Sequence, residues 1–464
     1  MGTQPAPPHA DAVELSGRLA RGETTALAAT RACLARIEAD EPRINAFVAL
    51  DPDGALEAAR ASDERRALGR ARGPLDGIPL AVKDNLRVAG MPTTGGHAAR
   101  GVAADGTDAA DGTDAADAVA VAALRSAGAV VLGKLNLHEG ALGATTDNPH
   151  HGRTINPLRE GFTPGGSSGG SGAAVAAGFA PIALGTDTMG SVRIPAAYCG
   201  CYGLKPTRGL VGRTGLLPLS PTLDTIGPLA RSPRDLALAL EAMGTFDAAD
   251  PDGVPPARRH APVLARRLDG LRIGVPAGLA TVACEPAILR ALDRALDAAR
   301  DAGATILDLP LDGWDPHRTR RAGLLVSEAE AALAHGEAIA REPDRFGETF
   351  RALVAYGAAI PAPKLAGAYD TLRRASAAAR RALDACDALV MPTAPQRAFA
   401  HGAEAPANQA DLTALANAAG LPALAMPVPL DADELPGSVQ LLGPDWSEPA
   451  LVALAGELAD RLRR

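Results

Sequence analysis

"GFTPGGSSGGSGAAVAAG", residues 161–178, is the stretch on which the interpretation of this chain depends, because three serines lie in a glycine-rich run. A flexible linker would have polar flanks without regular structure. Here the run continues into "FAPIALGTD" (179–187), which is apolar enough to fold and be buried. The sequence therefore argues against a linker.

A phosphate-binding loop is a second interpretation. Such a loop needs a lysine at its end, as in G-x-x-x-x-G-K-[ST], or a G-x-G-x-x-G motif directly after a strand. The sequence has no lysine between Lys134 and Lys205, and "LREGFTP" (158–164) does not have the composition of a strand. Both observations disfavour a phosphate site.

A nucleophile elbow is a third interpretation, because residues 166–170 match G-x-S-x-G. Ser168 would then be the nucleophile of an α/β-hydrolase-like esterase, with an acid and a histidine later in the chain. Pro164 and Gly165 are poor strand residues, and no downstream histidine lies in a loop that looks built for this task. The esterase is kept as an alternative.

The use of lysine suggests a fourth interpretation. Lysine and arginine together number 46, but only four are lysine, namely Lys83, Lys134, Lys205 and Lys364. Arginine does not lose its proton in a protein, whereas a buried lysine can. Lys83 ends an apolar strand candidate, "GIPLAVK" (77–83), so burial can lower its pKa and make it a base. A serine nucleophile needs a base, and a second serine can relay the proton.

Asp84 follows Lys83 directly and would oppose this pKa shift if its carboxylate faced the same side. Adjacent residues of a strand face opposite ways, so we expect Asp84 to point away from Lys83. Lys134 and Lys205 are expected to have structural roles.

Three distant segments carry a resemblance to a known family. They are "GIPLAVKDN" (77–85), "PGGSSGGSGAAVAAG" (164–178) and "GTDTMGSVRIPAAYCGCYGLKPT" (185–207). In this order they resemble the amidase signature hydrolases, which use a Ser-cisSer-Lys triad. The likeness is strongest over about 75–230 and continues more weakly through "LVMPTAP" (389–395) and "GLPALAMPVPLDADELPGSVQLLG" (420–443).

The resemblance implies a role for each matching residue. Ser191 would be the nucleophile, Ser167 the bridging serine after a cis peptide bond, and Lys83 the base. The chain would then be an amidase that hydrolyses a small-molecule carboxylic amide to an acid and ammonia or an amine through an acyl-serine intermediate. Neither a metal nor an organic cofactor is implied.

The turn before Ser191 is expected to stabilise the oxyanion of the intermediate. Its backbone N–H donors come from Thr188, Met189, Gly190 and Ser191. Met189 stands where the family usually has the first glycine of Gly-Gly-Ser. A backbone donor survives this change, but the shape of the pocket need not, so Met189 is our candidate determinant of substrate specificity.

Ser168, Asp187 and Arg193 also match the family pattern. We expect them to hold the loops around the site, with Asp187 and Arg193 as a buried ion pair.

The same family contains the glutaminase-type A subunit of tRNA-dependent amidotransferases, which works inside a complex. That subunit usually has glutamine after the arginine, where this chain has Ile194. The glutaminase is therefore an alternative function, and a catalytically idle interaction subunit is another. The complete set of serine and lysine residues disfavours the idle subunit.

Strand and helix candidates alternate along the chain, which predicts an α/β fold with a mixed, largely parallel twisted sheet covered on both faces by helices. This is also the amidase signature fold that the resemblance implies. We expect a single domain over 1–464, with a helical N-terminal region (about 1–70) and the core motifs over about 75–230. Residues of about 245–265, polar and rich in proline, are expected to be a surface excursion or a soft boundary.

The composition narrows the partners and the location. The net charge of −8 argues against a nucleic-acid footprint, which is usually basic. We find neither a signal peptide nor an apolar run long enough to span a membrane, and the five cysteines lack metal-type spacing. A cytoplasmic enzyme is expected, and a homodimer is compatible with the sequence.

Overall fold

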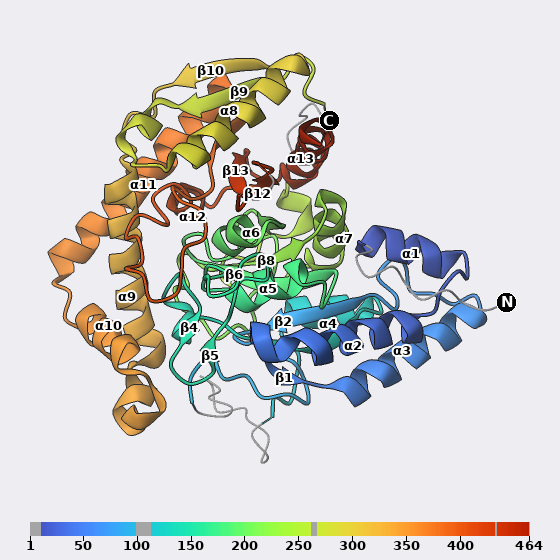
Figure 1. Ribbon diagram of the computed structural model, residues 1–464. Coiled ribbons are helices and arrows are strands. Elements are labelled where there is room, and N and C mark those ends of the chain that lie inside the picture. Colours follow the sequence, from blue (N-terminus) through green and yellow to red (C-terminus); the bar gives the residue numbers. More distant parts are fainter. Residues whose placement is uncertain (1–10, 99–112, 261–266, 432–433, 464) are drawn as a thin grey trace.

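The computed structural model describes residues 11–98, 113–260, 267–431 and 434–463. Its centre is an eleven-stranded sheet with the strand order β1-β3-β2-β6-β8-β7-β12-β13-β11-β9-β10. Helices cover both faces of the sheet (Figure 1), so the expected α/β fold with a mixed, helix-covered sheet is confirmed.

The strands of this sheet have the bounds β1 Phe47–Leu50, β2 Pro79–Lys83, β3 Val130–Leu135, β6 Ile182–Asp187, β7 Tyr202–Lys205, β8 Thr225–Ala230, β9 Arg272–Pro276, β10 Thr305–Leu309, β11 Ala388–Pro392, β12 Ala423–Val428 and β13 Gly437–Leu442. A separate two-stranded ribbon consists of β4 (Asp147–Asn148) and β5 (Gly152–Arg153).

The α-helices have the bounds α1 Ala12–Ala20, α2 Ala26–Ile44, α3 Pro52–Ala67, α4 Val119–Ser126, α5 Gly169–Ala176, α6 Arg193–Cys199, α7 Pro233–Met243, α8 Pro286–Asp301, α9 Pro316–Arg341, α10 Glu348–Ala358, α11 Ala362–Ala385, α12 Ala414–Ala419 and α13 Glu448–Leu462. Helix α9 packs against both α10 and α11, and the three helices lie along one side of the molecule in Figure 1.

Parallel pairing occurs in two blocks of the sheet. Strands β3, β2 and β6 form one block, and β11, β9 and β10 form the other. The remaining neighbours pair antiparallel. The first block positions the site, because the carboxyl ends of the parallel strands β2 and β6 meet at the same edge of the sheet.

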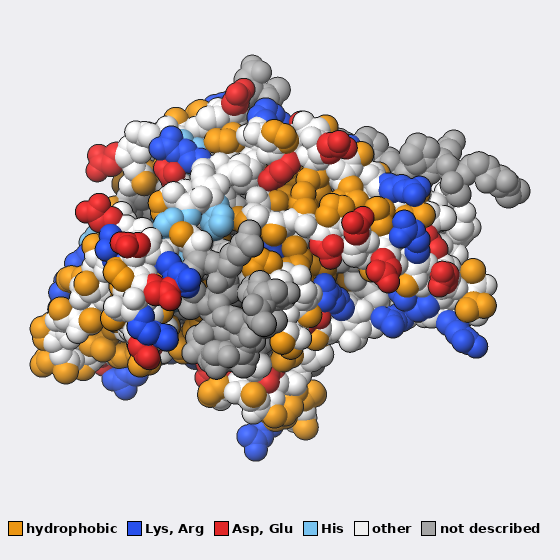
Figure 2. Space-filling view, turned by 90° about the horizontal axis from the view of Figure 1, so that it is seen from below, with side chains coloured by type: hydrophobic (Ala, Val, Ile, Leu, Met, Phe, Trp, Pro, Cys, Tyr) orange, Lys and Arg blue, Asp and Glu red, His pale blue; other side chains and the backbone are white. Residues whose placement is uncertain are grey.

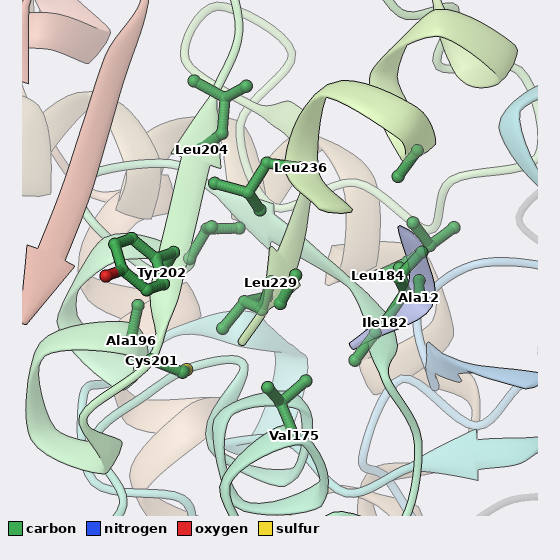
Figure 3. Close-up of a cluster of buried hydrophobic side chains, with 14 of the residues drawn as sticks. Ala12, Val175, Ile182, Leu184, Ala196, Cys201, Tyr202, Leu204, Leu229 and Leu236 are labelled. Atoms are coloured by element: carbon green, nitrogen blue, oxygen red, sulfur yellow. The ribbon is translucent and has the colours of Figure 1, made fainter. Parts of the chain in front are cut away.

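Every residue of β2, β3 and β6 is buried, because helices cover both faces of these strands. Strands buried on both faces have mainly apolar sequences, as these three do. Figure 3 shows Ile182 and Leu184 of β6 and Leu229 of β8 in one cluster with Val175 of α5 and Leu236 of α7. Burying such an aliphatic side chain stabilises the fold by roughly 1.5–3 kcal/mol. The strand ends that carry polar side chains are therefore held on a rigid base.

Strands and helices alternate along much of the chain as the sequence predicts, and the strand candidate at 77–83 is present as β2. Thr25 caps α2, because its side chain accepts a hydrogen bond from the N–H of Ala28. Strands β7 and β8 were not predicted, since β7 has only four residues and β8 contains a glycine and a proline. The short helices α6 and α12, at seven and six residues, were not predicted either.

The segment of about 245–265 is described up to residue 260, and it is tied to the rest of the chain. Arg213 forms ion pairs with Asp250 at 2.6 Å and with Asp252 at 2.8 Å. These contacts fix the first half of the segment against the loop that follows β7.

Figure 2 shows one face of the molecule, on which acidic and basic side chains are interspersed among apolar ones. Among the described residues, no helix combines the length and the apolar character that crossing a bilayer requires.

Candidate active site

Three segments that are far apart in the sequence meet at the carboxyl edge of β2 and β6. Lys83 is the last residue of β2, Ser167 lies just before α5, and Ser191 lies in the loop between β6 and α6. The main chain fastens two of these segments together, because the N–H of Ser168 donates to the carbonyl oxygen of Ser191 at 3.2 Å.

Lys83 is fully buried and contacts two hydroxyl groups. Its Nζ lies 2.8 Å from Ser167 Oγ and 2.7 Å from Thr186 Oγ1. The peptide bond between Gly166 and Ser167 is cis, which is the conformation that the resemblance implies. Asn85 donates to the same Thr186 hydroxyl at 3.1 Å, so the amine sits in a defined polar niche inside an apolar core.

Burial lowers the pKa of Lys83 to about 7, and the negative charges of Asp224 and Asp187 only partly offset this shift. Asp84 does not face the amine. Its carboxylate lies 2.9 Å from Lys134 Nζ on the other side of the strand, as the alternation of strand side chains predicts. Lys83 can therefore lose its proton near neutral pH.

Ser191 lies in the wall of a pocket with an empty volume of about 590 Å³, and 9% of the residue is exposed. The pocket is bounded by the loop after β6, by helix α9 and by the loop before α12. Most of its lining is aliphatic or backbone, and it consists of Ala141, Leu142, Gly143, Ala144, Gly166, Thr188, Met189, Ser191, Ile194, Leu219, Arg320, Leu324, Ser327, Pro406, Ala407, Gln409 and Ala410.

The loop before Ser191 was expected to supply four N–H donors. Among the described residues, no acceptor is bonded to the N–H groups of Thr188, Met189 and Ser191. Gly190 is a correction to the expectation, because its N–H donates to Asp187 Oδ1 at 2.7 Å and is already occupied. Within the described chain, three of the four expected donors are therefore free.

Asp187 and Arg193 form the expected buried ion pair, with Arg193 Nη2 3.0 Å from Asp187 Oδ1. Burial alone would raise the pKa of Asp187, but the charge and hydrogen bonds of Arg193 and a bond from Asn417 lower it to about 2. Arg193 also donates to Asn417 at 2.6 Å and to Gln440 at 2.8 Å. The pair thus joins the Ser191 loop to α12 and β13.

The Ser168 hydroxyl is fully engaged by the backbone. Its Oγ donates to the carbonyl oxygen of Thr186 at 3.1 Å and accepts the N–H of the same residue at 3.2 Å. The side chain is fully buried, and in the described chain no strand leads into this turn. The esterase alternative with Ser168 as nucleophile is therefore not supported.

The other two buried lysines have contacts that differ from those of Lys83. Lys134 pairs with Asp84 and donates to Thr93 Oγ1 at 2.6 Å. Lys205 donates to the carbonyl oxygen of Pro206 at 2.8 Å, and burial lowers its pKa to about 7. A lowered lysine pKa therefore does not by itself identify a base; the contact with Ser167 distinguishes Lys83.

Two residues at the site were not predicted. Thr186 could have been found, because it lies in "GTDT" near the end of β6, the strand that pairs with the one carrying Lys83. Asn417 precedes "GLPALAMP" by three residues, and no local signal links it to a loop 230 positions away.

In the described part of the chain, no group of three or more His, Cys, Asp or Glu residues is placed to hold a metal ion.

The mixed, helix-covered sheet brings a buried lysine and two serines to one strand edge, where lysine, and not histidine, contacts serine. This arrangement defines a class of hydrolytic enzyme. The family model described as Amidase matches residues 28–452. The chain therefore belongs to the amidase family, the amidase signature hydrolases.

Individual relatives differ in what they are named for. The A subunit of the glutamyl-tRNA(Gln) amidotransferase of Chloroflexus aurantiacus is 38% identical over an alignment of 489 residues. The alignment covers 98% of this chain and 96% of that protein. The solved peptide amidase of Stenotrophomonas maltophilia is 33% identical with a TM-score of 0.80, covering 98% of this chain and 97% of that one. A chain from a vestigial protein complex connected with the origins of an s-triazine catabolic enzyme is 35% identical with a TM-score of 0.87, covering 97% and 98%.

Proposed function

We propose that the protein is an amidase that hydrolyses a carboxylic amide to an acid and ammonia or an amine through an acyl-serine on Ser191. The observation that carries the proposal is the contact of buried Lys83 with Ser167 at 2.8 Å, beside a pocket whose wall contains Ser191. No histidine is needed in this arrangement, because the lysine has a pKa of about 7.

Acylation begins when neutral Lys83 accepts the proton of Ser167 and Ser167 accepts the proton of Ser191. Ser191 Oγ attacks the amide carbonyl carbon, and a new C–O bond forms while the carbonyl electrons move to the oxygen. The free N–H groups of Thr188, Met189 and Ser191 are available to that oxyanion. Donors aimed in advance at a developing charge contribute roughly 3–4 kcal/mol of transition-state stabilisation each.

Collapse of the tetrahedral intermediate breaks the C–N bond. The leaving nitrogen takes the proton that the serine and lysine held, so ammonia or an amine departs and the lysine is neutral again. Water then loses a proton to the same pair and attacks the acyl carbon. The ester bond to Ser191 breaks, Ser191 regains its proton, and the acid leaves.

The glutaminase is the second candidate, and the 38% identity with the A subunit of an amidotransferase favours it. Glutamine carries a carboxylate and an ammonium group, which need charged partners. The charged side chain of the pocket lining is Arg320, and its Nε already donates to Asp411 at 2.6 Å. Ile194 and Met189 add apolar surface beside Ser191. The pocket therefore fits a neutral, largely apolar amide better than glutamine.

The test is an ammonia-release assay with the purified chain alone. We expect it to hydrolyse neutral amides such as butyramide and benzamide without a partner protein, and L-glutamine at a lower kcat/KM. Ser191→Ala is the matched control, and it should release no ammonia above background. Activity confined to glutamine would favour the glutaminase, and failure on every amide would overturn the proposal.

A further inference from the structure

Apart from Ser191, the lining of the pocket contains four polar side chains, those of Thr188, Arg320, Ser327 and Gln409. Thr188 donates to Asp224 at 2.6 Å, and Arg320 is engaged by Asp411 and His317. Ser327 and Gln409 differ from these two residues. They lie on α9 and in the loop before α12, on walls of the pocket that Ser191 does not occupy.

Gln409 is oriented by a relay of buried groups. Gln396 Nε2 donates to the Tyr198 hydroxyl at 2.8 Å, and that hydroxyl donates to Gln409 Oε1 at 3.2 Å. Burial raises the pKa of Tyr198, so its hydroxyl keeps the proton that it donates. Because the oxygen of the Gln409 amide is bonded to Tyr198, its NH₂ group is directed elsewhere.

The NH₂ group of Gln409, a residue that is only 7% exposed, has no acceptor among the described residues. The hydroxyl of Ser327 is also without a partner there, although the residue is only 1% exposed. The Ser327 hydroxyl is an enclosed group of this kind, and a buried donor without an acceptor is unfavourable. The Gln409 NH₂ group also has no protein acceptor among the described residues and belongs to the same pocket lining, so one ligand acceptor can complete the hydrogen bonds of both groups.

We propose that Gln409 and Ser327 form a polar subsite that binds a hydrogen-bond acceptor of the substrate, such as a ketone, ester or amide oxygen, beyond the scissile amide. This inference rests on the proposed amidase function and narrows its substrate class. The substrate is a neutral amide with a mainly apolar chain that carries one internal acceptor. Gln409 and Ser327 are specificity residues, and Tyr198 is a positioning residue that acts through Gln409.

Matched amides test the subsite, because they differ only in the acceptor. 4-Oxopentanamide is compared with 4-methylpentanamide, and 5-oxohexanamide with 5-methylhexanamide, so that two distances from the scissile bond are sampled. At one of these lengths, we expect kcat/KM for the oxo compound to exceed that for its methyl isostere by about tenfold, the ratio that one satisfied hydrogen bond contributes.

Gln409→Glu keeps an oxygen for the Tyr198 hydroxyl and replaces the free NH₂ group by a carboxylate oxygen, which cannot donate a hydrogen bond. It should reduce the oxo-to-methyl ratio to about one, and the ratio is the readout because a change in the pocket lining also alters kcat/KM for the methyl amide. Ser327→Ala should lower the ratio as well. Tyr198→Phe should also lower the oxo-to-methyl ratio, because it frees the Gln409 amide to rotate.

The outcomes separate this inference from the function on which it rests. If the wild type hydrolyses both members of each pair at equal kcat/KM, the subsite is refuted while the amidase stands. A ratio above one that persists in Gln409→Glu, or a loss that affects both amides equally, also refutes it. If the wild type hydrolyses no amide at all, the proposed function is refuted, and the subsite proposal that rests on it is refuted as well.

Discussion

Lys83 Nζ lies 2.8 Å from Ser167 Oγ, although the two residues are 84 positions apart in the chain. The contact is enclosed, because both side chains are fully buried. Burying a lysine in this way lowers the stability of the fold, and this is offset by a benefit only if the neutral amine acts as a base. The first predictions therefore concern this pair.

Lys83→Arg should be as inactive as Lys83→Ala, because a guanidinium group keeps its proton and cannot act as a base. The expected loss in kcat/KM is roughly 10²–10⁴-fold, the range that proton transfer by a positioned group contributes. Lys364→Arg is the control, since Lys364 is exposed and should tolerate the change. Amide hydrolysis and circular dichroism are measured together. Near-normal activity of folded Lys83→Arg would refute the role of Lys83.

The activity should rise with pH through an apparent pKa of about 7, because only the neutral form of Lys83 accepts a proton. Below pH 7, kcat/KM should fall about tenfold per pH unit. Lys205 has a similarly lowered pKa but contacts Pro206 and not Ser167. The ascending limb should therefore persist unchanged in Lys205→Met. If this variant moves the limb, the titration belongs to Lys205.

The three serines should respond differently to a serine-reactive fluorophosphonate probe. Ser191→Ala should abolish labelling, and Ser167→Ala should slow it strongly. Ser168→Ala should still be labelled, because the Ser168 hydroxyl is bonded to the backbone of Thr186. Losing that hydroxyl leaves buried backbone groups of Thr186 without this partner and should cost roughly 1–3 kcal/mol of stability. Mass spectrometry of the labelled peptide locates the adduct, and an adduct on Ser168 would reinstate the esterase.

Lys83→Met should stabilise the protein at neutral pH by a few kcal/mol, because it removes a buried amine. In the unfolded chain Lys83 titrates near 10.5, whereas burial lowers its folded pKa to about 7. Between these values the unfolded state binds more protons, so the wild-type free energy of unfolding gains roughly 1.4 kcal/mol per pH unit from this group. The advantage of Lys83→Met should thus shrink as pH rises from 7 towards 10, as measured by urea denaturation. A constant difference would show that the folded pKa is not lowered.

The parts of the site that follow from the sequence are those with local or patterned signals. Lys83 at the end of an apolar run and Asp84 on the opposite face follow from strand alternation, and both positions agree with the structure. The glycines around Ser167 identify a special backbone. These signals, with the resemblance, were enough to predict the contact of Lys83 with Ser167.

The remaining contacts depend on how distant segments pack, and a single sequence does not encode that arrangement visibly. The N–H of Gly190 is taken by Asp187, and this depends on the loop closing over the carboxylate. Helix α9 supplies Leu324 and Ser327 to the pocket, although its sequence carries no motif. Two parallel blocks separated by antiparallel strands could not be derived either, since strand order is decided by tertiary packing.

Met189 and Gly323 offer a test of the pocket shape. A methyl group added at Gly323 would lie 2.4 Å from Met189 Sδ, so the absence of a side chain lets Met189 lie against α9. Gly323→Ala should push the Met189 side chain into the pocket and lower kcat/KM for benzamide several-fold, with little effect on propionamide. Its thermal stability should not fall, because alanine is favoured over glycine within a helix by about 1 kcal/mol. The double variant Met189→Gly with Gly323→Ala should restore benzamide hydrolysis, since the clashing side chain is gone. If the single and double variants have the same benzamide-to-propionamide ratio, Met189 does not set the size of the pocket.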